Sequence, residues 1–119
     1  MTLDEYFEGR QDSRQLFETL RETINTLGET RLRVTKSQIA FYHRKAFAWA
    51  WIPGIYLHNR PTAPLVLTVA MRRRDPSPRW KEIVEPYPGR FTHHLELYSP
   101  AQIDPEVRTW LREAWAQAG

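Results

Sequence analysis

The stretch that decides the fold is RLRVTKSQIAFYHRKAFAWAWI, residues 31–52. Its apolar residues recur at every second position, over Arg31–Val34, then over Gln38–Phe41 and Phe47–Ile52. A period of two is typical of β-strands, because successive side chains of a strand point to opposite faces of a sheet. Short polar turns separate the three runs, so we expect consecutive antiparallel strands.

Helical patterns lie on both sides of this stretch. Thr2 and Glu5 predict a capping box for a short first helix, and Asp12 or Ser13 is expected to cap a longer second one. The second helix carries an apolar stripe at helical spacing: Leu16, Phe17, Leu20, Ile24 and Leu27. A closing helix is expected to begin at Asp104-Pro105, because Asp is a preferred cap and proline a preferred first residue. Its stripe is Val107, Trp110, Leu111, Ala114 and Trp115.

Two further strands are expected, over Leu65–Arg72 and Phe91–Tyr98. Between them, Arg79–Glu85 is expected to form a helical turn that prolines 86 and 88 end. The order of elements predicts an α+β fold, a two-layer sandwich. Its mostly antiparallel sheet has about five strands, with the N-terminal and C-terminal helices packed on one face. Residues 1–119 fit a single domain by their length.

The composition excludes several classes of protein. The chain has no cysteine, which excludes disulfide scaffolds and thiolate metal sites. No secretory signal opens the sequence, and the longest apolar runs, Phe47–Ile52 and Leu65–Met71, are too short to cross a bilayer. The sequence therefore predicts a cytoplasmic protein without a membrane partner.

Charge is sorted along the chain. Residues 1–29 have a net charge of −4, residues 30–94 of +9 and residues 95–119 of −2, within a total of +3. A basic segment held between acidic ones indicates a positive surface and an anionic partner. The alternative is that acidic helices neutralise a basic sheet within one fold.

Strand alternation also predicts which side chains lie on each face of the sheet. The face under the helices is expected to hold the large apolar residues Leu32, Val34, Ile39, Phe41, Phe47, Trp49, Trp51, Leu65, Leu67, Val69, Met71, Phe91, Leu95 and Leu97. The opposite face is expected to hold Arg31, Arg33, Gln38, Ala40, Tyr42, Ala48, Ala50, Thr68, Ala70, Arg72, Thr92, His94 and Tyr98. Its alanines form either a solvated or dimerising surface, or a shallow floor on which Arg and Tyr hold phosphates and rings. A shift of one residue would exchange the two faces.

The most concentrated basic element is Arg72–Lys81, with five cations in ten residues beside Trp80. Such a loop suits phosphate contact and base stacking. The alternative is that Asp75 pairs with an arginine and Trp80 anchors the loop in the core. The candidate residues for binding nucleic acid or another anion are Arg31, Arg33, Lys36, Tyr42, Arg72, Arg73, Arg74, Arg79, Lys81 and His94.

The sequence contains no catalytic motif. The four histidines are not spaced for a shared metal ion, and the glycines form no phosphate-binding loop, so we expect neither a metal nor a cofactor. His93 is expected in the core, and His94 on the opposite face is the better functional candidate. A general acid or base needs a partner that the sequence does not identify, so a non-enzymatic protein is favoured.

Several segments together resemble a known family: Val34–Phe41, Phe47–Trp49, Arg72–Asp75, Trp80–Glu82 and His93–Leu97. From Tyr6 to Trp115 the chain is similar to the bacterial domain-of-unknown-function family numbered 5655. The resemblance implies a small domain that occurs alone or attached to larger proteins, some of them nuclease-like. This association favours nucleic acid, but it implies no catalytic residues.

We therefore expect a binding module for an anionic partner, nucleic acid first, on the free sheet face and the basic loop. One alternative is a small-molecule site, catalytic or not, lined by Tyr42, His94 and Tyr98, with an arginine for a carboxylate or phosphate. That alternative predicts a concave site and a perturbed pKa of His94. Another alternative is a dimerisation or adaptor domain, a homodimer built on the alanine-rich face.

Overall fold

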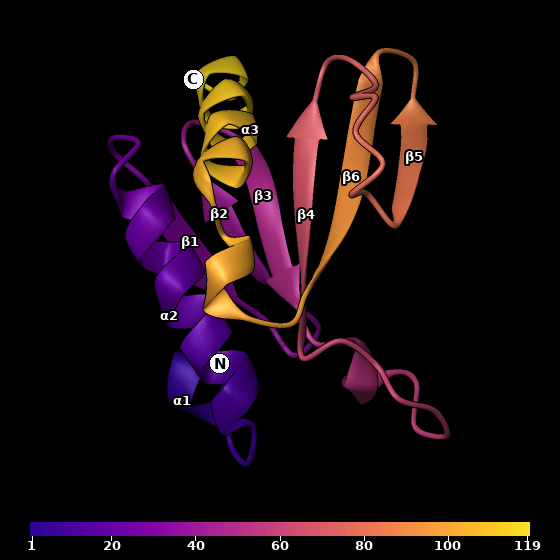
Figure 1. Cartoon of the computed structure of the whole chain (residues 1–119). Coiled ribbons are helices and arrows are strands. Elements are labelled where there is room, and N and C mark those ends of the chain that lie inside the picture. Colours follow the sequence, from indigo (N-terminus) through magenta and orange to yellow (C-terminus); the bar gives the residue numbers. More distant parts are fainter.

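The structure, a computed structural model, describes residues 1–119 (Figure 1). Its helices are α1 (Leu3–Tyr6), α2 (Gln11–Asn25) and α3 (Pro105–Gln117), with short 3-10 helices η1 (Pro53–Ile55) and η2 (Pro100–Gln102). Its strands are β1 (Arg31–Val34), β2 (Ile39–Tyr42), β3 (Ala46–Trp51), β4 (Leu65–Met71), β5 (Glu82–Tyr87) and β6 (Arg90–Leu97). None of the helices is long and apolar enough to cross a lipid bilayer.

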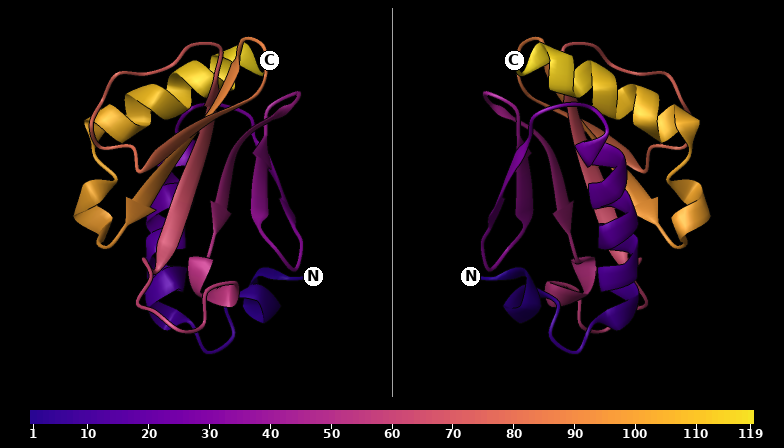
Figure 2. Two further views of the ribbon diagram at one scale, coloured as in Figure 1. Left: turned by 90° about the vertical axis from the view of Figure 1, so that its right-hand side faces the viewer. Right: turned by 90° about the vertical axis from the view of Figure 1, so that its left-hand side faces the viewer.

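The six strands form one antiparallel sheet in the order β1-β2-β3-β4-β6-β5. Helices α2 and α3 lie on one side of it, as the front view and the two side views show (Figures 1 and 2). The predicted α+β class is confirmed, with six strands in place of about five. We call the opposite side the free face. By strand register it holds Arg31, Arg33, Ala40, Tyr42, Trp49, Trp51, Val66, Thr68, Ala70, Glu82, Val84, Arg90, Thr92, His94 and Glu96.

The core lies between the helices and the sheet, because each long helix buries one apolar stripe. The buried helical residues are Leu16, Phe17, Leu20, Ile24, Val107, Trp110, Leu111 and Ala114. The capping box at Thr2 and the cap at Asp104 are confirmed. The expected cap of α2 is wrong: the helix begins at Gln11, and Ser13 is buried and donates its hydroxyl to the Pro64 carbonyl oxygen at 2.7 Å.

The expected orientation of β3 is wrong, and this correction changes the free face. Ala48 and Ala50 are fully buried and lie on the helix side of the sheet, whereas Trp49 and Trp51 lie half-buried on the free face. The cause is a β-bulge in which Phe47 is the extra residue, since Tyr42 pairs with Ala46 while its neighbour Phe41 pairs with Ala48. Two of the four alanines expected on the free face, Ala48 and Ala50, are therefore not part of it.

The segment expected to form a helical turn is instead the edge strand β5. Its proline, Pro86, lies where the pairing with β6 shifts register, between Val84 and Tyr87. Proline lacks an amide proton, so within sheets it is confined to edges and bulges. Gly89, with a φ of +81°, then turns the chain into β6.

Candidate functional site

The basic loop is residues 72–81, and its middle part, from Arg73 to Trp80, lies on the helix side of the sheet (Figure 1). Trp80 anchors it: its ring centroid is 4.1 Å from that of Trp110 on α3 and 4.9 Å from that of His93 on β6. Asp75 is buried and accepts hydrogen bonds from Trp80 Nε1 at 2.9 Å and from the Ser77 amide at 3.0 Å. The loop is therefore an integral part of the packed layer.

Carboxylates neutralise most cations of this loop. Arg73 binds both carboxylate oxygens of Glu113, at 2.9 and 3.0 Å, and contacts Asp75 at 2.8 Å. Glu113 and Asp75 raise the pKa of Arg73, so the guanidinium stays charged and its charge is balanced by these two carboxylates. Two other cations of the loop form ion pairs: Arg79 with Asp104 and Glu106, at 3.0 and 2.8 Å, and Lys81 with Glu96, at 3.0 Å.

Burial alone would raise the pKa of Asp75, but the hydrogen bonds from Trp80, Ser77 and Arg73 outweigh it and hold that pKa below its usual value. His93 is fully buried as expected: its Nε2 accepts from the Asp75 amide at 3.0 Å, so its Nδ1 carries the proton toward the Val69 carbonyl oxygen at 3.2 Å. Burial lowers the pKa of His93, and the imidazole is neutral.

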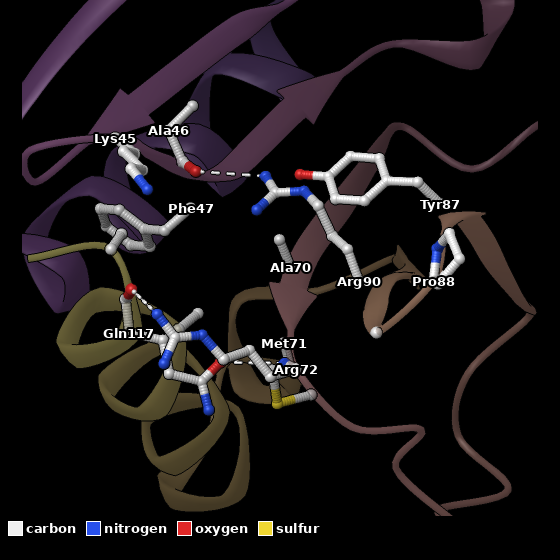
Figure 3. Close-up of a pocket in the computed structure, with 13 residues that line it drawn as sticks. Lys45, Ala46, Phe47, Ala70, Met71, Arg72, Tyr87, Pro88, Arg90 and Gln117 are labelled. Atoms are coloured by element: carbon white, nitrogen blue, oxygen red, sulfur yellow. Dashed lines mark hydrogen bonds between the residues drawn. The ribbon is translucent and has the colours of Figure 1, made fainter.

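A cavity of about 240 Å³ opens at the end of the sheet where β3 and β4 separate (Figure 3). The β3–β4 pairing starts at Ala48 and Val69, so the bulge leaves the preceding residues of β3 without partners on β4. We call this the basic cavity. It is lined by Lys45, Ala46, Phe47, Ala70, Met71, Arg72, Tyr87, Pro88, Gly89, Arg90, Ala114, Gln117 and Ala118.

Three cations from separate segments of the chain meet at the basic cavity: Lys45, Arg72 and Arg90. Arg90 donates to the Ala46 carbonyl oxygen at 3.4 Å, and its guanidinium lies 5.9 Å from the ring centroids of both Trp49 and Tyr87. Arg72 donates to the Gln117 carbonyl oxygen at 3.1 Å. No carboxylate lines the cavity, and none of the three cations forms an ion pair.

The free face stays basic beyond this cavity toward the β1 edge. Arg31 lies over the Tyr42 ring, 5.5 Å from its centroid, and Arg33 follows on the same face of β1. These residues and Leu32 line a shallow hollow, and both arginines are exposed without ion pairs. A row of unpaired arginines beside aromatic rings is suited to phosphates and flat bases.

The second cavity of interest lies at the other end of β4, about His94, and measures about 400 Å³. Two residues that line this His94 cavity are held by the buried Thr68: Trp51 Nε1 donates to Thr68 Oγ1 at 3.0 Å, and Thr68 Oγ1 lies 2.7 Å from His94 Nδ1. Burial lowers the pKa of His94, and the nearby Glu82 offsets this only in part. No three His, Asp or Glu side chains are grouped to hold a metal ion.

The structure divides the predicted site residues among separate regions. Arg31, Arg33 and Tyr42 come together on the free face, Arg72 lies at the basic cavity, and His94 and Lys81 line the His94 cavity. Lys36 lies in the β1–β2 turn at the opposite end of β1 from Arg31. The others, Arg73, Arg74 and Arg79, belong to the basic loop on the helix side. Tyr42 and Tyr98 do not line the His94 cavity, which corrects the lining expected for a small-molecule site.

Sequence reasoning missed Lys45, Arg90, Trp49, Trp51 and Glu82 as site residues. For Arg90 a signal was present: counting back from His94 in steps of two places Thr92 and Arg90 on the same face. For Trp49 and Trp51 no local signal existed. The bulge at Phe47 moves both side chains to the other face of the sheet, while large and small residues still alternate along the sequence.

Comparison with known proteins finds one match, which covers nearly the whole chain. No curated protein and no solved structure matches it significantly. One family model matches residues 3–118, described as a domain of unknown function (DUF5655). The predicted resemblance is thereby confirmed, and this chain belongs to that family.

Proposed function

We propose that this protein binds single-stranded nucleic acid across the free face, with a backbone phosphate in the basic cavity. The observation that carries the proposal is the convergence of Lys45, Arg72 and Arg90 on a cavity that no carboxylate lines. In the basic loop, by contrast, Arg73 and Arg79 meet carboxylates. Unmatched cations held close together raise the local potential, which a bound anion relieves.

The side chains that surround the cavity suit a phosphate. Arg90 is held by two aromatic rings and a carbonyl oxygen, so little side-chain entropy is lost when it binds a ligand. A guanidinium presents parallel N–H donors that match two phosphate oxygens, and the exposed ammonium of Lys45 adds a mobile charge.

The extent of the basic surface favours a polymer over a small anion. Arg31 and Arg33 continue the positive charge along the free face, outside the basic cavity. Acidic residues are concentrated in the other layer, where α2 and α3 carry Asp12, Glu18, Glu22, Glu106 and Glu113. This asymmetry orients an incoming polyanion toward the sheet.

A single strand fits this surface better than a duplex. The free face carries two half-buried tryptophans, Trp49 and Trp51, on which unstacked bases can pack. A duplex hides its base faces and is read by an element that enters a groove, whereas both long helices of this protein lie behind the sheet (Figure 2).

The test is fluorescence anisotropy with labelled single-stranded and double-stranded oligonucleotides of the same sequence, repeated across a salt series. We expect saturable binding of the single strand, with an affinity that falls steeply as salt rises. The variant Lys45→Ala/Arg90→Gln should weaken binding about tenfold or more and reduce the salt slope by roughly 1.4, since two phosphate contacts are lost.

The matched control is Arg21→Ala/Arg112→Ala, which removes the same charge from the helical layer. It should leave both affinity and salt slope close to those of the unmodified protein. An equal loss of affinity in the two double variants would show that binding depends only on net charge. Absence of any binding at low salt would refute the proposal.

A further inference from the structure

The His94 cavity contains a hydrogen-bond donor whose position and protonation are set by the sheet. Thr68 is buried and its hydroxyl, which accepts from Trp51 Nε1, has one proton to donate. His94 Nδ1, at 2.7 Å, is the only acceptor in contact with that hydroxyl. Thr68 therefore donates to Nδ1, and the proton of the neutral His94 is on Nε2, the ring nitrogen that faces Glu82.

Beside this donor lies a carboxylate without a cation of its own. Glu82 Oε1 is 4.0 Å from His94 Nε2, and no Lys or Arg lies within ion-pair distance of Glu82. The other carboxylate of the cavity, Glu96, is matched by Lys81 at 3.0 Å. The cavity thus presents the N–H donor of His94 beside the Glu82 carboxylate, whose two oxygens accept no hydrogen bond within the protein.

We propose that the His94 cavity takes a guanine base of the bound strand, a role that rests on the proposed nucleic-acid function. Guanine presents one acceptor, O6, followed by the donors N1–H and N2–H along one edge. This order is the complement of the His94 Nε2–H donor and the two Glu82 oxygens. Adenine, cytosine and uracil lack the acceptor-donor-donor order.

The rest of the cavity suits a flat ring joined to a phosphate. Its lining includes Trp51, whose indole is held in place by the bond to Thr68, and the apolar residues Pro53, Leu57 and Val66. Arg60, from the loop between β3 and β4, adds a cation with no ion pair at its rim. Ala70 at the basic cavity and Val66 at the His94 cavity are separated by four residues of β4, about 13 Å, so one strand can reach both.

The experiment compares three labelled oligothymidylates that differ at one central position, which is guanine, hypoxanthine or adenine. Hypoxanthine retains O6 and N1–H but lacks the N2 amino group, so it isolates the second donor. For the unmodified protein we expect the guanine oligonucleotide to bind roughly tenfold more tightly than the other two.

Two variants assign the preference to this cavity. Glu82→Gln keeps the shape of the side chain but replaces an acceptor oxygen with an NH₂ group, and it should abolish the preference for guanine. His94→Phe keeps a flat ring without the donor and should also reduce the preference. Glu22→Gln, on the outer side of α2, is the control with the same change of charge as Glu82→Gln.

The outcomes separate this inference from the proposed function. Equal binding of the three oligonucleotides, or a guanine preference that survives Glu82→Gln, would overturn the guanine pocket and leave strand binding in place. Lack of binding to every oligonucleotide would overturn the proposed function itself. The ratio of affinities is the deciding quantity, because a change of net charge alters all three affinities alike.

Discussion

The basic loop and the basic cavity are the two places where cations are concentrated, and they differ in what surrounds those cations. In the loop, Arg73 and Arg79 meet three carboxylates of α3 or of its N-cap, and Asp75 adds a fourth from the loop itself. In the basic cavity, Lys45 and Arg90 meet none. The density of positive residues along a sequence therefore does not show where positive charge is free in the folded protein.

The difference has a physical cause in how each region is attached to the core. The loop is tied down by a buried tryptophan and a buried carboxylate, so its arginines are placed against the acidic surface of α3. The cavity is made by a bulge that opens the β3–β4 ladder, and no carboxylate lies among the residues that line it. We infer that the loop cations stabilise the fold and that the cavity cations are available for ligands.

The largest expected effect on stability comes from Asp75→Ala in the basic loop. The substitution leaves the buried Trp80 Nε1–H without an acceptor and removes one partner of Arg73. We expect the free energy of unfolding to fall by about 3 kcal/mol, measured by urea denaturation. The control is Glu22→Ala, which removes an exposed carboxylate and should change the free energy of unfolding little. If Asp75→Ala changed it as little as this control, Asp75 would not anchor the loop.

A smaller effect should separate the cations of the two regions. Arg79→Gln loses bonds to Asp104 and Glu106 and the contact with the Trp110 ring, and should lower the free energy of unfolding by about 1 kcal/mol. Lys45→Ala loses no ion pair and should change it by less than about 0.5 kcal/mol. If Lys45→Ala lowers the free energy of unfolding as much as Arg79→Gln does, in thermal or urea unfolding, then the cations of the two regions stabilise the fold equally and the distinction fails.

The smallest effect concerns pH. Burial lowers the folded-state pKa of His93 and of His94 below their unfolded values, so folding keeps both rings neutral. Stability should be fully present above about pH 6.5 and decrease as the pH falls below it, because the unfolded chain then binds protons that the folded protein excludes. Urea unfolding of the unmodified protein and of His58→Gln, which alters an exposed histidine, should show the same decrease. A free energy of unfolding that stays constant or rises from pH 7 to pH 5 would contradict it.

Much of the fold could be predicted from the sequence, because the helices and five of the six strands are marked by local periodicity and caps. The stripe that includes Leu16 and Leu20 and the cap at Asp104 are local signals, and the structure confirms them. Strand β5 was missed because its two glutamates and its proline match no buried strand pattern, and only pairing with β6 makes it a strand.

The candidate site was harder to predict, since it depends on long-range register. The rule that large apolar residues point inward placed Trp49 and Trp51 in the core. Two buried alanines, Ala48 and Ala50, lie on the helix side instead, because the bulge at Phe47 exchanges the faces of the residues that follow it. The pairing of Arg73 with Glu113, 40 residues away, likewise cannot be obtained from either segment alone.

The most direct test of the difference between the two regions is the salt dependence of oligonucleotide binding in two variants of equal charge. Lys45→Ala/Arg90→Gln removes two cations from the basic cavity, and Arg73→Gln/Arg74→Gln removes two from the basic loop. The account predicts that the slope of log K against log salt becomes shallower by roughly 1.4 in the cavity variant and is nearly unchanged in the loop variant. A shallower slope in the loop variant, with the cavity variant unchanged, would contradict it.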